Sequence, residues 1–179
     1  MKKLIFTLFA AILFSASFAQ TRSTSSGAKL SVGLEFGLPL GNFSDGITIG
    51  FGGSGKAEIP VSPAFNFTVT AGYTTYYYDK MQKAGAEFFG FDTYQGYVPL
   101  KAGGKYFFSP NVYGEAEIGA AIGTNNNAGT AFIYAPGLGV SYPVSSKHDI
   151  DFGVRYEGWS QNGANIGQVA FRLAYKFGL

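Results

Sequence analysis

The sequence predicts an all-β fold, an eight-stranded antiparallel up-and-down transmembrane β-barrel. The first observation is the stretch from Asn165 to Leu179, in which large apolar side chains alternate with small or polar ones from Val169 onward. That period of two is typical of a β-strand with one apolar face. The second observation is that seven further stretches repeat the alternation, and no helical period follows the N-terminal segment. The third is that tight turns and longer loops alternate between the stretches, as in an antiparallel membrane barrel.

The first four strands are expected at residues 30–40, 47–61, 65–77 and 94–108. In the first, leucine, valine and phenylalanine occupy the even-numbered positions, whereas serine, glycine and glutamate occupy most odd-numbered ones. The second has apolar ends and a glycine-rich middle, and the third alternates aromatic residues and valine with asparagine and threonine. The fourth alternates large apolar residues with lysine and glycine. It contains Pro99, for which we expect a bulge because proline has no N–H to donate to a β-ladder.

The last four strands are expected at residues 112–122, 131–144, 150–157 and 165–179. The fifth alternates valine, isoleucine and alanine with tyrosine and glutamate. The sixth alternates large apolar residues with alanine and glycine, and Pro136 within it predicts a second bulge. The seventh alternates large apolar residues with charged residues and glycine. Tight turns are expected after the second, fourth and sixth strands, and generally longer loops after the others.

The apolar faces are predicted to point outward, toward lipid. They carry about forty large apolar side chains in total, whereas an eight-stranded barrel has an interior only just wide enough for side chains or one small ligand. The opposite faces are rich in glycine, alanine, serine and threonine, which suits a narrow interior. A soluble barrel with an apolar interior is therefore the less consistent alternative.

Aromatic residues gather at both ends of the expected strands, where they predict two girdles at the membrane interfaces. The girdle at the tight-turn ends is expected to contain Phe65, Phe67, Tyr106, Phe108, Tyr142, Tyr175 and Phe177. The girdle near the longer loops is expected to contain Tyr73, Tyr77, Tyr94, Phe132, Tyr134, Tyr156 and Trp159.

The N-terminus has the pattern of a secretory signal peptide at residues 1–19. Two lysines precede an apolar stretch that is too short to span a bilayer, and small residues precede a cleavage site near Ala19. We expect the mature chain to start at Gln20, with a flexible lead-in at 20–29 and the barrel at 30–179.

Cleavage removes two of the 13 basic residues and leaves 11 against 11 acidic residues. This balance argues against nucleic-acid binding, and the absence of cysteine excludes disulfides and thiolate metal sites.

Three segments resemble the bacterial outer-membrane β-barrel domain family, namely Tyr97–Phe108, Tyr134–Val140 and Asp151–Tyr156. These small eight-stranded barrels include the transmembrane part of outer-membrane protein A. The resemblance covers essentially the whole mature chain and implies a location in the outer membrane of a Gram-negative bacterium, surrounded by its lipid. It also implies that the barrel-assembly machinery reads the C-terminal strand, although Leu179 stands where the family usually has phenylalanine. Short turns and both termini are then expected in the periplasm.

Charged side chains on the inward faces are the main candidate site. Counting from the tight-turn ends places several of them at similar heights, and neighbouring strands should bring opposite charges together. An unpaired charge in a narrow interior costs several kcal/mol, so pairing is expected. The predicted interior charge network contains Glu35, Lys101, Glu115, Glu117, Arg155, Glu157 and Arg172.

Two functions remain open for such a network. It can fill and rigidify the barrel of a structural or surface-interaction protein, or its pairs can rearrange to gate a narrow porin-like channel for ions or small solutes. A third class, an enzyme that modifies outer-leaflet lipid, would need a histidine or an equivalent base near a serine at the outer rim. It is not expected, because the single histidine, His148, falls in a tight turn at the opposite end. The run Gly50–Lys56 matches part of a phosphate-binding loop, but Ala57 follows and no helix is expected there. We therefore expect no cofactor and no metal.

The longest expected loop, residues 79–92, contains Phe88, Phe89 and Phe91. Three aromatic side chains on an exposed loop can contact a partner, surface lipid or another loop. The alternative is that they fold onto the rim of the barrel.

Overall fold

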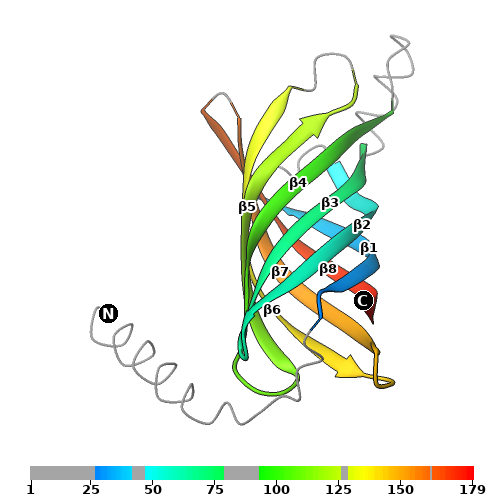
Figure 1. Cartoon of the computed structure of the whole chain (residues 1–179). Helices are drawn as coiled ribbons and strands as arrows, with labels where there is room; N and C mark the ends of the chain where they lie inside the picture. The colour runs from blue at the N-terminus through cyan, green and yellow to red at the C-terminus, as the bar shows by residue number, and fades with distance from the viewer. Residues whose placement is uncertain (1–26, 42–46, 79–92, 126–128, 162) are drawn as a thin grey trace.

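Eight antiparallel strands form a closed barrel in the computed structural model (Figure 1). The structure describes residues 27–41, 47–78, 93–125, 129–161 and 163–179. Each strand pairs with its neighbours in chain order, which confirms the predicted fold class. The strands are β1 (Lys29–Leu40), β2 (Ile47–Ser62), β3 (Phe65–Tyr78), β4 (Tyr94–Phe107), β5 (Val112–Gly123), β6 (Thr130–Pro143), β7 (His148–Gln161) and β8 (Ala164–Gly178).

The alternation in the sequence becomes an alternation of burial around the barrel wall. In β1, Ser31 and Glu35 are 2% and 6% exposed, whereas Val32 and Leu34 are 65% and 49% exposed. The same period of two appears along most of the other strands. Because successive side chains of a strand point to opposite sides of the sheet, small and polar residues face the interior and large apolar residues face outward.

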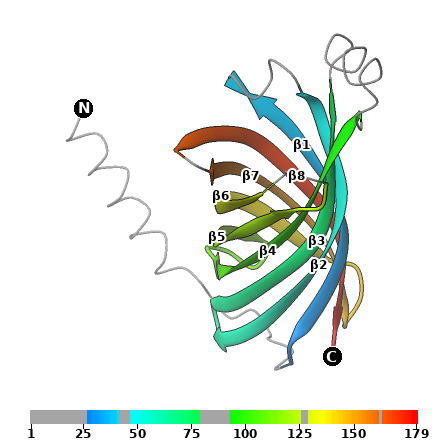
Figure 2. The same cartoon turned by 90° about the horizontal axis from the view of Figure 1, so that it is seen from above.

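The barrel closes between the first and last strands. β1 and β8 pair from Lys29 opposite Gly178 to Leu40 opposite Gly167. The backbone N–H of Leu179 donates to the carbonyl of Ala28 at 3.0 Å, so the C-terminus lies beside the start of β1 (Figure 1). Viewed from above, the strands curve around a common interior (Figure 2). Closure leaves the sheet that the described strands form without an unpaired edge.

The connections divide the barrel into two ends. Residues 63–64, 108–111 and 144–147 connect strands at one end, which we call the turn end. The opposite ends of the same strands form the end that we call the loop end. Within the described residues, no helix is long and apolar enough to cross a membrane.

The two prolines inside strands do not form the expected bulges, and that prediction was wrong. Both Pro99 and Pro136 pair in register with residues of β5. The ladder is interrupted only on the β3 side of Pro99 and on the β7 side of Pro136, and the same register resumes beyond each gap. A proline removes one donor but need not insert a residue. Register shifts occur instead at both ends of β2 against β3.

Trp159 is not part of the outward aromatic girdle, and this expectation was also wrong. The strand β7 extends to Gln161 instead of ending near residue 157, so the parity of the strand directs Trp159 inward, where it is 3% exposed. The alternation is hidden in the sequence because the outward position before it is Gly158. The ring of Tyr134 covers that glycine from the neighbouring strand.

Candidate functional site

The interior of the barrel holds almost all charged side chains of the described residues. Seven acidic and seven basic side chains form ion pairs there, and Lys147, in an exposed turn, is the remaining described charge. The interior charges are therefore balanced. The acidic residues are Glu35, Glu58, Glu115, Glu117, Asp149, Asp151 and Glu157, and the basic residues are Lys29, Lys56, Lys101, Lys105, Arg155, Arg172 and Lys176.

Eight of these side chains form a continuous series of alternating sign, which we call the charge chain. Its consecutive members are joined by ion pairs of 2.6 to 3.5 Å. They project from six strands, β1, β2, β4, β5, β7 and β8, and so link opposite walls of the barrel. In order, the members are Glu115, Lys56, Glu117, Lys101, Glu157, Arg155, Glu35 and Arg172.

Neutral side chains satisfy further polar atoms of the charge chain. Ser54 donates to Glu35 Oε1 and Thr70 donates to Glu117 Oε1, both at 2.5 Å. The Glu157 carboxylate also accepts a hydrogen bond from the Trp159 indole, at 2.9 Å. Buried charges are costly unless they are paired and hydrogen-bonded, and these contacts supply the second requirement.

A separate group of four charges, the charge quartet, lies nearer the turn end. Lys105 Nζ lies 2.7 Å from Glu58 and 3.3 Å from Asp151, and Lys176 Nζ lies 2.9 and 3.0 Å from the same two carboxylates. Each ammonium thus contacts both carboxylates and each carboxylate contacts both ammonium groups. The Tyr113 hydroxyl donates to Asp151 at 2.8 Å. All four charged side chains are at most 2% exposed.

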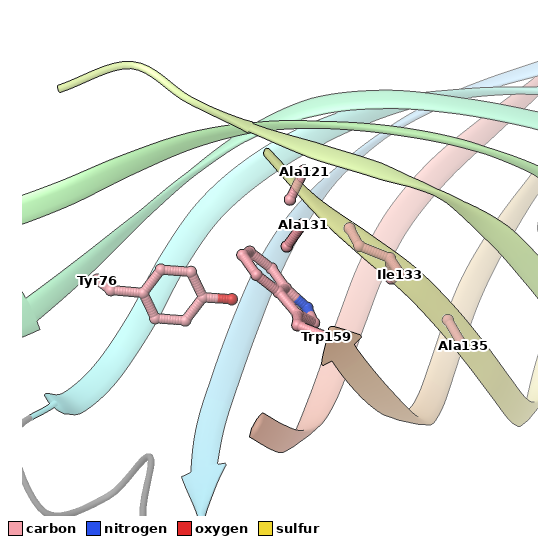
Figure 3. Close-up of a cluster of buried hydrophobic side chains, with 6 residues drawn as sticks. All are labelled: Tyr76, Ala121, Ala131, Ile133, Ala135 and Trp159. Carbon is pink, nitrogen blue, oxygen red and sulfur yellow. The ribbon is translucent and has the colours of Figure 1, made fainter. Parts of the chain in front are cut away.

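Aromatic side chains occupy the lumen on the loop-end side of the charge chain. Tyr76, Tyr97 and Trp159 form edge-to-face pairs with ring centroids 4.9 to 6.0 Å apart, and we call them the aromatic cluster. Tyr76 and Trp159 point toward each other beside Ile133 and three alanines of β5 and β6 (Figure 3). Tyr76 and Ile133 have no exposed surface.

A smaller aromatic pair lies on the turn-end side. Phe107 and Tyr113 are 5% and 2% exposed, and their ring centroids are 5.6 Å apart. The ammonium of Lys105 lies 4.0 Å from the centre of the Tyr113 ring, in cation–π contact. Two cavities in the lumen have volumes of about 10 and about 20 Å³, room for one or two water molecules each. Side chains therefore occupy the described interior at the charge chain, at the charge quartet and at the aromatic groups on either side of them.

The seven residues proposed from the sequence all belong to the charge chain. Glu35 forms ion pairs with Arg155 and Arg172, and Glu117 forms one with Lys101. These are the pairs expected from the adjacency of the strands. Phe88, Phe89 and Phe91 lie outside the described residues. The run Gly50–Lys56 lies within β2 and no helix follows it.

Sequence reasoning missed half of the interior charges: Lys29, Lys56, Glu58, Lys105, Asp149, Asp151 and Lys176. Most of them lie an even number of residues from an inward position already recognised on the same strand. Counting every second residue along the strand could therefore have found them. Lys56 and Glu58 are harder, because the glycine-rich middle of β2 weakens the alternation.

His148 does not lie free in a turn as expected. It is the first residue of β7, and its ring stacks on Tyr175 with centroids 5.4 Å apart. Among the described residues, no group of three or more histidine, cysteine, aspartate or glutamate side chains is arranged to hold a metal ion.

Comparisons with known proteins identify the fold. No protein-family model matches the sequence, and no curated protein matches it either. The solved structure of Neisserial surface protein A is similar, with a TM-score of 0.60 at 17% identity, over 86% of this chain and 98% of that one. The attachment invasion locus protein Ail of Yersinia pestis has a TM-score of 0.56 at 15% identity, over 85% of this chain and 99% of that one.

The outer membrane protein OprG of Pseudomonas aeruginosa has a TM-score of 0.54 at 7% identity, over 86% of this chain and 96% of that one. At these identities the likeness concerns the fold alone. The chain has the fold of small eight-stranded outer-membrane β-barrels.

Proposed function

We propose that the chain is an integral protein of the bacterial outer membrane, with a closed lumen and a structural or surface-interaction role. The observation that carries the proposal is the distribution of side chains across the barrel wall. Charged residues point inward and are paired, whereas the outward face carries large apolar residues from every strand. Such a distribution is stable when lipid surrounds the barrel, and it is the reverse of that of a soluble protein.

Three features of the interior support a closed lumen. The aromatic cluster occupies the loop-end side, the Phe107–Tyr113 pair occupies the turn-end side, and balanced ion pairs fill the space between them. Two cavities between these groups, of about 10 and about 20 Å³, have room for only one or two water molecules each. The proposed role is non-enzymatic, since the described buried acids and bases contact one another instead of an open cleft.

Conductance separates this proposal from a narrow gated channel. The refolded protein would be inserted into planar bilayers beside an Arg155→Ala variant, because Arg155 links two carboxylates of the charge chain. An unrelated porin would show that the assay detects channels. We expect no stable openings from the wild-type protein. Stable openings whose conductance changes in the variant would support the channel and contradict the closed lumen.

Location and processing form a second, separate test. We propose that cleavage near Ala19 produces a mature chain that starts at Gln20, and that the barrel-assembly machinery inserts it through its C-terminal strand. Mass spectrometry of the protein from purified outer membranes should give the mass of residues 20–179. Recovery only in the soluble fraction would contradict the membrane proposal.

A further inference from the structure

The two ends of the charge chain meet at one cavity. Glu115 is the first member of the chain and Arg172 is the last, and both line the cavity of about 10 Å³. Lys56 and Arg155, two other members of the chain, also line it. The chain therefore runs through the interior and returns to the place where it starts.

Each end carries a buried polar atom without a protein partner. These atoms are Glu115 Oε1 and Arg172 Nη1. The Arg172 side chain is 3% exposed and the Glu115 side chain is 11% exposed. None of the described ion pairs joins the two residues. An unsatisfied buried donor or acceptor costs about 1–3 kcal/mol, and more for a charged group, so both atoms favour a bound partner.

The chemistry of the two atoms defines the kind of partner. Glu115 Oε1 can only accept a hydrogen bond and Arg172 Nη1 can only donate one. A halide would be repelled by the carboxylate, and a metal cation would be repelled by the guanidinium and by Lys56. A water molecule donates to the first atom and accepts from the second. A volume of about 10 Å³ is close to the minimum that holds one water molecule.

We infer that one buried water molecule bridges Glu115 Oε1 and Arg172 Nη1 and closes the charge chain into a ring. The ring then consists of eight charged side chains of alternating sign and this water. The water ties β5 to β8, two strands that do not pair with each other. The inference does not depend on the proposed function, because a conducting barrel could hold the same water.

The test is a crystal structure of the full refolded protein at a resolution that shows ordered water, with bromide in the crystallisation salt. We expect a density peak within about 3.2 Å of both atoms and no anomalous signal at the bromine edge. A bromide signal at that position would overturn the inference in favour of a halide site. Direct contact between Glu115 and Arg172, or the absence of a peak while other buried waters are visible, would also overturn it.

A matched pair of variants tests the same site in solution. Glu115→Gln keeps an oxygen acceptor, whereas Glu115→Leu removes it at similar size. Dipolar transfer from water to the Arg172 guanidinium protons, measured by NMR, should persist in wild type and Glu115→Gln and be lost in Glu115→Leu. Transfer that persists in Glu115→Leu would contradict the bridge. Far-UV circular dichroism would establish that both variants fold, and the crystal of the wild-type protein decides the question if either does not.

Discussion

Glu35 illustrates how a single charge is accommodated inside the barrel. Its carboxylate accepts a hydrogen bond from Ser54 at 2.5 Å and lies 2.9 Å from Arg155 and 3.3 Å from Arg172. Removing such a carboxylate from water costs several kcal/mol, which the two arginines offset only while both remain in place. Glu35 therefore stabilises the barrel mainly because, without it, two arginines would be buried with too few partners.

Glu35→Gln should lower the free energy of unfolding. The carboxamide keeps the shape but leaves both arginines without their shared negative charge, and breaking a buried pair costs about 3–5 kcal/mol. Urea unfolding of the protein refolded in lipid vesicles, followed by tryptophan fluorescence, measures the change.

Glu115→Gln is the matched control for this prediction. It makes the same chemical change at the end of the charge chain, where one lysine is the only ion-pair partner among the described residues and the side chain is partly exposed. We expect a smaller loss of stability there. Equal losses at the two positions would contradict the view that Glu35 holds two arginines.

At the scale of the strand, parity predicted most of the barrel. The eight strands and the inward side of Glu35, Lys101 and Arg172 follow from a period of two. The order of the strands follows from the alternation of tight turns and longer loops. The ion pairs themselves follow from neither pattern, because they depend on how far neighbouring strands are staggered around the barrel. Parity also holds at Trp159, but the sequence did not show that β7 reaches it, because the outward Gly158 interrupts the apolar series and hides the loop-end residues of β7.

Aromatic rings that cover glycines on neighbouring strands lock the relative position of two strands. The Tyr134 ring of β6 lies against Gly158 of β7, and a Cβ atom at Gly158 would overlap that ring. Gly55 of β2 is a contrasting position, since a Cβ atom there would meet only a carbonyl oxygen at 4.0 Å.

Gly158→Ala should therefore destabilise the barrel, while Gly55→Ala should have little effect. Overpacking costs about 1–3 kcal/mol when neighbours cannot move, and the ring must leave its place over β7 to admit the methyl group. Urea unfolding of the two variants compares them directly. Adding Tyr134→Ala should remove most of the difference, and a cost of Gly158→Ala that survives this change would exclude the ring as its cause.

The described barrel has polar and charged side chains inside and large apolar side chains outside, the reverse of a soluble globular protein. The closed ladder pairs most backbone groups of the described strands, and the charged side chains pair with one another inside the barrel, so the outer wall can be covered by hydrocarbon instead of water. Two outward residues with the same exposed fraction can therefore lie in different surroundings, depending on their height on the barrel. A residue halfway along a strand should face hydrocarbon, and an equally exposed residue at a strand end should face the polar interface.

Ile118 and Val61 test this difference, because they are similarly exposed, at 60% and 66%, and lie at different heights on the barrel. Ile118 lies in the middle of β5 and Val61 lies at the turn end of β2. Arginine on the lipid face costs about 2–4 kcal/mol at the bilayer midplane and about 0–1 kcal/mol near the interface. Ile118→Arg should therefore lower the free energy of unfolding in vesicles far more than Val61→Arg. In a barrel surrounded by water, both arginines would be solvated and the two variants would unfold alike, an outcome that would contradict membrane integration.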